Sequence, residues 1–320
     1  MIAAGSSCWI ITDGNAGMES QCLGLAEALR VEARNIRVVM RSPWRDLAPH
    51  LRFGLQHAFV GNEFTAPWPE LVIATGRQSV PASLYVRRQS PRTRRVQIQN
   101  PGISPRHFDL VVAPAHDRLF GANVIQTLGA LHRVTPQRLS EEAKLLERKV
   151  ATLSRPFIGV LIGGANSAYQ FGPETARKLA ADIVQEARKL GASVLATPSR
   201  RTGQENIEIL RAALADTPGF FWDGSGANPY FAILGLADVI LVTGDSVNMV
   251  TEACATGRPV YVYDLPDGSK KSKRFLRALT LRGYARSYSN SLEAYGVNRL
   301  DEMARVARAV GQLGQTGFSK

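Results

Sequence analysis

The sequence predicts an α/β protein built from two Rossmann-like, doubly wound domains. Short β-branched runs alternate with longer segments of helical periodicity along most of the chain. This alternation is typical of parallel sheets covered by helices on both faces. The length of 320 residues suits two domains of ordinary size rather than one core. We therefore expect two such domains facing a cleft, with a C-terminal helix closing back on the first.

The first half of the chain shows five strand-like runs and three helical patterns. Strands are expected at residues 8–11, 36–40, 71–74, 95–99 and 109–112. Helices are expected at residues 19–30, 44–59 and 79–88, because apolar residues recur there at helical spacing.

The second half repeats the scheme. Strands are expected at residues 157–162, 193–196, 220–222, 238–242 and 260–263. Helices are expected at residues 173–190, 203–214, 229–234 and 246–256, with a closing helix at 301–310. The boundary falls in the charged, helix-prone segment 135–155, so we expect a first domain of residues 1–140 joined by 296–320, and a second of residues 150–290.

The composition indicates a globular protein with a strong preference for anions. The formal net charge is +12, and both halves of the chain are basic. Such a charge favours nucleic acid, anionic membranes or phosphate-bearing substrates. Aromatic residues are not interleaved with the basic runs, so a nucleic-acid partner is not expected. Instead, the arginine-rich run 87–95 suggests an anionic membrane surface as a partner, although it equally fits a solvated loop.

The spacing of the cysteines and the hydropathy of the chain indicate the cellular compartment. The three cysteines are scattered without CxxC spacing, which favours a reducing compartment and excludes a zinc ribbon. No run reaches the roughly 18 apolar residues of a transmembrane helix, and the first residues lack a basic n-region. We expect a cytoplasmic protein, with peripheral contact to the inner face of a membrane as an extension. No metal site and no cofactor are expected.

Two loops of the first half carry residues suited to chemistry. Asp13-Gly14-Asn15 follows the first strand, where glycine permits close backbone approach and a helix begins. A tight, capped turn explains these residues nearly as well. Gly76-Arg77 follows the third strand in the same manner, and Arg77 offers a bidentate fork for a phosphate or carboxylate.

Two loops of the second half suit a diphosphate. Gly163-Gly164 follows an apolar strand, and paired glycines there expose backbone N–H groups as phosphate-binding turns do. Ser199-Arg200-Arg201 follows the next strand and offers a hydroxyl and two guanidinium groups.

The most specific segment runs from Gly244 to Glu252. Gly244 turns the chain after a strand, and Asp245 or Ser246 caps the next helix, whose first N–H groups suit a pyrophosphate. Glu252 lies six residues after Ser246, from where it could reach a ribose hydroxyl. Capping alone explains Asp245, but not the combination of turn, anion donors and carboxylate.

The segment 244–259 resembles the nucleotide-sugar segment of GT-B glycosyltransferases. More specifically, the chain is similar over most of its length to the plant elongated-mitochondria (mitochondrial fission) proteins and their bacterial relatives. The similarity rests on TDGNAGMESQCLGLAEAL (12–29), ATGRQSVPASL (74–84), QNPG (99–102), GGANSAYQF (163–171), TPSRRT (197–202) and TGDSVNMVTEA (243–253).

This resemblance implies a fold and a set of ligand contacts. The fold it implies is GT-B. The donor-nucleotide contacts it implies are Gly163, Gly164, Ser199, Arg200, Asn228, Ser246, Met249 and Glu252. It leaves the acceptor side to Asp13, Gly14, Asn15 and Arg77. Bacterial members are regarded as glycosyltransferases, some linked to lipooligosaccharide core assembly, whereas plant members act at the mitochondrial surface.

The motifs and the resemblance together predict a metal-independent glycosyltransferase. It moves a sugar from a nucleotide-diphosphate sugar to a lipid-linked, glycolipid or lipopolysaccharide-core acceptor. Asp13, or failing that His116 after the strand at 109–112, would deprotonate the acceptor hydroxyl. Two alternatives remain: a nucleotide-sugar epimerase of the same fold, and a non-catalytic scaffold at a membrane.

Overall fold

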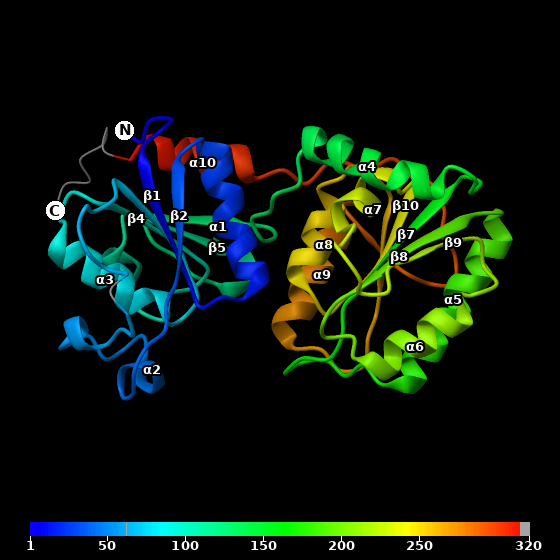
Figure 1. The fold of residues 1–320 in the computed structure, drawn as a ribbon, viewed down its shortest axis with the longest axis horizontal. Coiled ribbons are helices and arrows are strands. Elements are labelled where there is room, and N and C mark those ends of the chain that lie inside the picture. Colours follow the sequence, from blue (N-terminus) through cyan, green and yellow to red (C-terminus); the bar gives the residue numbers. More distant parts are fainter. Residues whose placement is uncertain (62, 314–320) are drawn as a thin grey trace. The chain divides into compact units, whose positions relative to one another are not determined.

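The chain forms two compact units in a computed structural model, which describes residues 1–61 and 63–313. Unit 1 comprises Met1–Arg133 and the residues from Glu302 onward, and unit 2 comprises Val134–Asp301. Each unit has its own parallel sheet and its own core, so each is described by itself (Figure 1).

The sheet of unit 1 has six strands, all parallel, in the order β2-β1-β3-β4-β5-β6. The strands are β1 (Ser7–Thr12), β2 (Glu32–Arg37), β3 (Leu71–Thr75), β4 (Arg94–Ile98), β5 (Leu110–Pro114) and β6 (Val124–Thr127). The order reverses between β1 and β3, because the chain first adds β2 on one side of β1 and then all later strands on the other.

Helices cover both faces of this sheet. They are α1 (Ala16–Leu29), α2 (Trp44–Leu47), α3 (Ser79–Gln89) and α10 (Met303–Gly311), with 3-10 turns at Leu55–His57, Pro105–His107 and Ala115–Asp117. One face buries an aromatic-rich core under α3, and the other packs the sheet against α1 and α10. Val306 and Val310 of α10 are fully buried in that second core. The predicted return of the C-terminal helix to the first domain is therefore confirmed for the helix itself, whereas residues 314–320 lie outside the described residues.

The sheet of unit 2 also has six parallel strands, in the order β12-β11-β10-β7-β8-β9. They are β7 (Phe157–Ile162), β8 (Ser193–Pro198), β9 (Gly219–Phe221), β10 (Val239–Thr243), β11 (Val260–Tyr263) and β12 (Arg286–Ser287). β7, β8, β10 and β11 are buried along their whole length, as expected of strands covered on both faces. The predicted fold class, α/β with two Rossmann-like sheets, is confirmed.

The helices of unit 2 are α4 (Pro136–Val150), α5 (Pro173–Leu190), α6 (Gln204–Ala213), α7 (Tyr230–Leu236), α8 (Val247–Cys254) and α9 (Lys270–Leu281). α5 begins and ends where its sequence directs: Pro173 starts the helix, and Gly191 follows it with φ of 59° in the left-handed region. The charged segment expected at the domain boundary forms α4, which packs on α7 within unit 2.

The prediction of a helix over residues 44–59 is wrong. Only Trp44–Leu47 and the 3-10 turn Leu55–His57 are helical. Pro49 lacks an N–H group, and Gly54 adopts a φ of 63°, so the helix cannot continue through either residue. The Trp44 indole N–H donates to the Phe53 carbonyl over 2.7 Å and holds this irregular segment in place.

Four other elements differ from the expectation, among them β12 (Arg286–Ser287), a two-residue strand that was not predicted. β2 lies at Glu32–Arg37 rather than 36–40, because it is an exposed edge strand whose polar residues carry no apolar alternation. β6 at Val124–Thr127 and α9 at Lys270–Leu281 were not predicted. The first is short, and the second is so basic that its apolar stripe, with Phe275 and Leu279 buried, is hard to see in the sequence.

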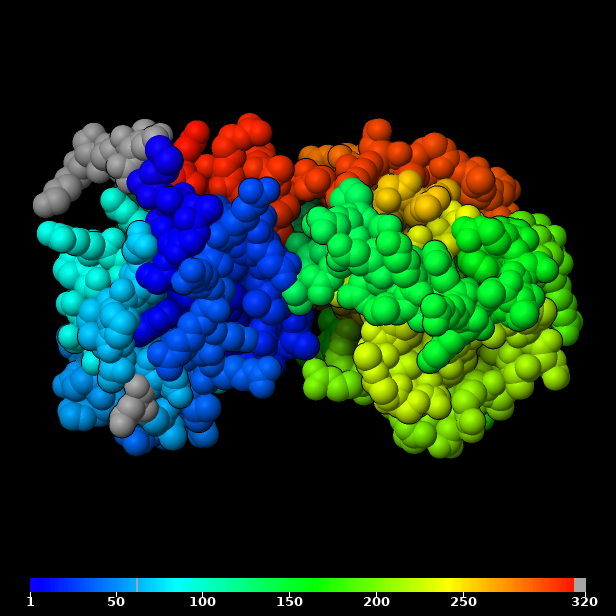
Figure 2. Space-filling model, turned by 45° about the horizontal axis from the view of Figure 1, so that its top comes forward, coloured from blue at the N-terminus to red at the C-terminus, as the bar shows by residue number. Residues whose placement is uncertain are grey.

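The last segment of unit 2 runs across its surface without regular structure. In Figure 2 it is the orange band that leads from β12 toward α10. Tyr295 attaches this segment to β11, because its hydroxyl donates to the Val260 carbonyl over 2.8 Å and accepts the Val260 N–H over 3.1 Å. Among the described residues, none of the helices is long and apolar enough to cross a membrane.

Candidate functional site

The strand order of unit 2 marks one point on the sheet as a binding crevice. The order reverses between β7 and β10, and ligands of doubly wound sheets bind beyond the carboxyl ends of the strands at that point. Gly163-Gly164 follows β7 and Gly244-Asp245-Ser246 follows β10. Two of the predicted loops therefore flank the reversal.

Asp245 joins the loops around this crevice. Its side chain is fully buried, and Oδ2 accepts hydrogen bonds from the Gly164 N–H over 3.1 Å and from Arg201 over 2.7 Å. Oδ1 accepts from the Thr243 hydroxyl over 2.7 Å. Because both oxygens are engaged, Asp245 fixes the loops after β7, β8 and β10 to one another. It does not cap α8.

The paired glycines are required by close approach rather than by an unusual backbone angle. A Cβ on Gly163 would lie 2.0 Å from Oδ1 of Asp245. A Cβ on Gly164 would lie 2.0 Å from the carbonyl oxygen of Arg201. The Gly163 N–H is already used, since it donates to Thr243 Oγ1 over 2.7 Å. The two N–H groups predicted to bind phosphate are thus both engaged within the protein.

The two predicted arginines of the loop after β8 lie in different environments. Arg201 turns inward to Asp245, whereas Arg200 is exposed and forms no ion pair among the residues that the structure describes. Ser199 shapes the loop, because its N–H donates to the Ile162 carbonyl over 2.8 Å and its hydroxyl accepts the Arg201 N–H over 3.2 Å. Arg200 is therefore the guanidinium that remains available to an anion at this edge.

The N-terminal end of α8 is capped in a way that suits an anion. Ser246 is the N-cap, and its hydroxyl accepts the Met249 N–H over 3.3 Å. Ser246 and Met249 are both partly exposed. The positive end of the helix dipole thus reaches the surface beside the crevice.

Glu252, expected near a ribose hydroxyl, lies buried against Tyr230. The Tyr230 hydroxyl donates to Oε2 of Glu252 over 2.7 Å. Burial, together with this negative partner, raises the pKa of Tyr230 well above its ordinary value, so the phenol keeps its proton. The sequence carried no signal for this partner, because Tyr230 lies 22 residues away in α7.

Asn228 joins the site through β8. Its Oδ1 accepts the Thr197 hydroxyl over 3.0 Å, and Thr197 belongs to the carboxyl end of that strand. Asn228 also lines a cavity of about 420 Å³ with the ring of Trp222 and residues of α4 and α7.

A second cavity opens beside Gly244. Its volume is about 540 Å³, and its lining includes Tyr169, Asp264 and Leu276. A Cβ on Gly244 would lie 3.2 Å from Leu276, so this cavity adjoins the crevice. Gly268 secures its rim, because its N–H donates to the Ala168 carbonyl over 2.7 Å and ties the loop after β11 to the loop after β7.

Unit 1 has its own reversal point, and the predicted loops flank it. Asp13 follows β1 and Gly76 follows β3, and these strands are neighbours. A Cβ on Gly76 would lie 3.1 Å from Oδ2 of Asp13, which shows how closely the two loops approach. Asn15 caps α1, since its side chain accepts the Gly17 N–H over 3.1 Å. Asp13 is exposed and accepts the Asn15 N–H over 3.3 Å.

The remaining predicted residues of unit 1 lie at different places. Gly14 adopts a φ of 84°, which its turn requires. Arg77 is exposed, and its guanidinium reaches the Arg45 carbonyl at 3.4 Å. His116 is buried after β5, and β4 separates β5 from β3 in the sheet. The strand order thus brings Gly76 to Asp13 and leaves His116 further along the sheet.

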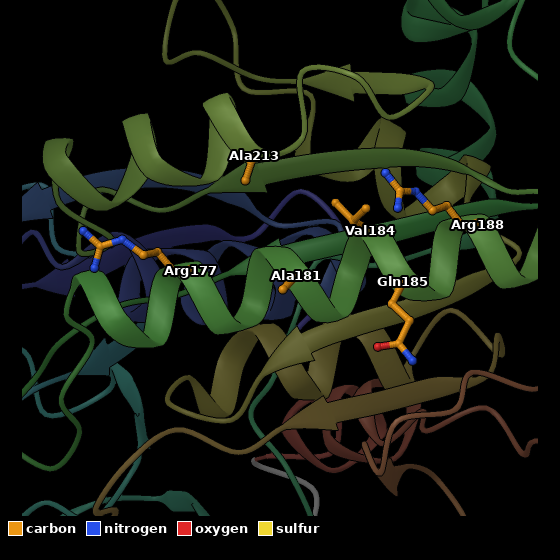
Figure 3. Close-up of a pocket in the computed structure, with 6 residues that line it drawn as sticks. All are labelled: Arg177, Ala181, Val184, Gln185, Arg188 and Ala213. Atoms are coloured by element: carbon orange, nitrogen blue, oxygen red, sulfur yellow. The ribbon is translucent and has the colours of Figure 1, made fainter.

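The pockets away from these edges offer less chemistry. A groove of about 460 Å³ lies between α5 and α6. Figure 3 shows Arg177 and Arg188 toward the two ends of its α5 wall, with Ala181 and Val184 between them. None of these residues follows a strand. Within the described ranges, no group of three or more His, Cys, Asp or Glu residues could hold a metal ion.

The fold and the reversal points define the class: a GT-B-type α/β protein. Its sheets match those of the UDP-GlcNAc 2-epimerase from Methanocaldococcus jannaschii, with a TM-score of 0.55 at 10% identity over 95% of this chain and 99% of that one. The identity is low enough that this likeness concerns the fold alone.

The family is shown by the sequence. Residues 16–313 match the family described as "Mitochondrial fission ELM1", and the chain belongs to this family. It is 30% identical over 280 residues to the mitochondrial fission protein ELM1 of Arabidopsis thaliana, a match that covers 78% of this chain and 65% of that protein. It is 24% identical to protein RP120 of Rickettsia prowazekii over 94% of this chain and 97% of that one.

Proposed function

We propose that this chain binds a nucleoside diphosphate sugar at the carboxyl edge of the unit 2 sheet and transfers the sugar to an acceptor hydroxyl. One observation carries the proposal: Asp245 locks the loops after β7, β8 and β10 together at the strand-order reversal. A pre-organised edge of this kind costs little ordering on binding, which favours affinity.

The diphosphate would lie between Arg200 and the start of α8. Arg200 is the exposed guanidinium of the edge, and the helix end adds a positive dipole next to it. Together they would stabilise the charge that develops on the leaving diphosphate, without a metal. The sugar would occupy the cavity beside Gly244, whose volume of about 540 Å³ lies in the range of small-molecule sites.

The choice of a nucleotide sugar also draws on structures of the same fold. One solved structure of the M. jannaschii enzyme, with a TM-score of 0.52, is described as a complex with UDP-GlcNAc and UDP. We therefore take uridine nucleotides as the first ligands to test.

Transfer is taken as the first reaction to test, and epimerisation as the alternative, because the carboxylates do not separate the two. Asp245 and Glu252 are both buried and hydrogen-bonded, whereas Asp264 is exposed and lines the cavity proposed for the sugar. Asp13 of unit 1 is exposed and would serve as the base for an acceptor hydroxyl, with His116 as the weaker candidate because it is buried. The acceptor would be a lipid-linked glycan or lipopolysaccharide core, met on the cytoplasmic side of a membrane.

Binding is tested by thermal shift and calorimetry against nucleoside diphosphates and their sugars, because a ligand of the native state raises the melting temperature. Arg200→Ala should weaken binding about tenfold or more, in line with a lost charge-assisted hydrogen bond. Arg211→Ala, an exposed arginine of α6, is the matched control and should bind as the parent does. Equal affinity of all three proteins would refute the assignment.

Product analysis then separates the alternatives. Transfer requires donor and acceptor together, whereas an epimerase changes the donor alone. Binding with neither reaction, in the presence of lipid-linked acceptors, would favour the non-catalytic scaffold.

A further inference from the structure

One side of unit 1 gathers positive charge without the carboxylates to balance it. Residues 71–116 contain seven arginines, no lysine and a single acidic residue, Asp109. Asp109 is committed to the interior, since it pairs with the fully buried Arg95 over 3.3 Å and accepts the Arg95 backbone N–H over 2.8 Å. Asp109 also pairs with Arg94 over 3.5 Å, and the five remaining arginines of the segment are exposed: Arg77, Arg87, Arg88, Arg92 and Arg106.

Hydrogen bonds place several of these cations together. Arg88 donates to the Arg52 carbonyl over 3.0 Å, and Arg52 Nη1 lies 2.9 Å from Nε2 of His107. Arg106 precedes His107, and Arg87 precedes Arg88. We call this set, Arg52, Arg87, Arg88 and Arg106, the arginine surface.

The pKa values of His107 and of the buried Arg95 reflect burial first and then the charges of the arginine surface. The pKa of His107 is lowered by burial and by the charges of Arg52, Arg95 and Arg87. The pKa of Arg95 falls to about 10, mainly through burial, with Arg87 adding to the effect and Asp109 opposing it. Like charges held this close destabilise the fold, so an anionic partner that covers them is favoured.

An exposed aromatic ring stands beside these charges. Phe53 follows Arg52 and is 81% exposed, although its backbone is fixed by the 2.7 Å hydrogen bond from the Trp44 indole. An exposed apolar ring on a fixed backbone next to guanidinium groups matches the interface of an anionic bilayer, where rings enter the headgroup region and arginines meet phosphates. A single ring provides no series of stacking platforms for a nucleic acid.

We propose that the arginine surface and Phe53 dock unit 1 on a bilayer that contains anionic lipid. Arg87 and Arg88 lie where α3 ends and β4 begins, whereas Asp13 and Gly76 follow the carboxyl ends of β1 and β3. The inference goes beyond the transfer reaction and requires neither donor nor acceptor.

The test is sedimentation of the full chain with vesicles of phosphatidylcholine plus phosphatidylglycerol, and with phosphatidylcholine alone. Binding should require the anionic lipid and weaken as salt rises. Arg87→Gln with Arg106→Gln should lower the partition coefficient about 25-fold, at about fivefold for each charge removed near the surface. Phe53→Ser should lower it about tenfold through lost apolar burial.

Matched controls exclude an effect of net charge or hydropathy alone. Lys270→Gln with Arg282→Gln removes two exposed charges from the two ends of the basic helix α9 of unit 2, and Leu145→Ser removes a side chain that is 73% exposed. Both should partition as the parent does. All variants should retain the parental nucleotide affinity, so a failure of docking is distinguishable from a failure of the donor site.

Three results would overturn the proposal. The first is equal binding to vesicles with and without anionic lipid. The second is loss of binding in the α9 variant but not in the arginine-surface variant, which would place the contact on unit 2. The third is absence of vesicle binding while a DNA duplex binds through the same arginines.

Discussion

Asp245 and Arg201 pair across two loops, with Nη2 of Arg201 2.7 Å from Oδ2 of Asp245. The aspartate side chain is fully buried, and that of the arginine is 40% exposed. Both residues were expected at the ligand, yet they bind each other. Their role is therefore to hold the edge of the sheet in shape, while Arg200 and the N-terminus of α8 stay exposed at the same edge, where we propose that the diphosphate binds.

Removal of Asp245 should destabilise unit 2 strongly. Asp245→Ala leaves the Gly164 N–H and the Thr243 hydroxyl without their buried acceptor, and we expect a loss of about 3–5 kcal/mol in the free energy of unfolding. Arg201→Ala should cost less, about 1–3 kcal/mol, because the buried carboxylate loses its cation but keeps the Gly164 N–H and the Thr243 hydroxyl. Urea unfolding measures both. Asp216→Ala, an exposed carboxylate of unit 2, is the control, and equal losses in all three would contradict the role of Asp245.

Gly163 should tolerate no side chain. A Cβ there would lie 2.0 Å from Oδ1 of Asp245, so Gly163→Ala must displace the carboxylate and should cost about 1–3 kcal/mol of stability along with nucleotide affinity. Gly296→Ala, in the irregular last segment of unit 2, meets nothing within 4 Å and should change neither. Thermal melts with and without nucleotide compare the two. Parental behaviour of Gly163→Ala would mean that the loops are not locked by this contact.

Gln99 should be more stable as glycine. It follows β4 with a φ of 69°, in the left-handed region that costs a side chain about 1–2 kcal/mol. After the greater entropy of glycine in the unfolded chain is subtracted, Gln99→Gly should gain roughly 0.5–1 kcal/mol. Gln89→Gly, at the end of α3, should instead lose stability, because glycine weakens helices. Urea midpoints with opposite signs are expected; a loss in both would show that the Gln99 side chain makes contacts that outweigh the strain.

The arginine surface makes stability depend on pH. His107 accepts a hydrogen bond from Arg52 only when neutral, and its pKa in the folded protein lies below the ordinary 6.5. Since the unfolded chain takes up this proton first, the free energy of unfolding should fall as the pH drops below about 6.5 toward the folded pKa. His107→Gln keeps an acceptor but does not titrate, so its unfolding free energy should lose this part of the slope. An unchanged slope would remove His107 as its source.

Much of the fold was predictable because it depends on local patterns. Pro173 and Gly191 mark the ends of α5, and the β-branched strands of both cores carry a continuous apolar signal. The helix expected over 44–59 failed because hydrophobic spacing there serves a packed irregular segment, in which Trp44 bonds to Phe53. α9 was missed because its charges dominate its composition.

The candidate site was predictable only as a set of loops. Glycines and polar residues after strands identify which loops meet, since the carboxyl ends of parallel strands share one edge. The residues that hydrogen-bond to one another at this edge are far apart in the sequence. Tyr230 and Glu252 are 22 positions apart, and Arg201 and Asp245 are 44 apart. Sequence spacing therefore does not predict which polar side chains bond to each other and which remain exposed.

The return of α10 to unit 1 has a consequence for biosynthesis. Val306 and Val310 complete a core whose other members, such as Cys22 and Leu25, leave the ribosome almost 300 residues earlier. Unit 2, which is continuous from Val134 to Asp301, can complete its own core while unit 1 still exposes the face of α1. The domain made first is thus finished last, and until then its uncovered face is a site for chaperones or for misassembly.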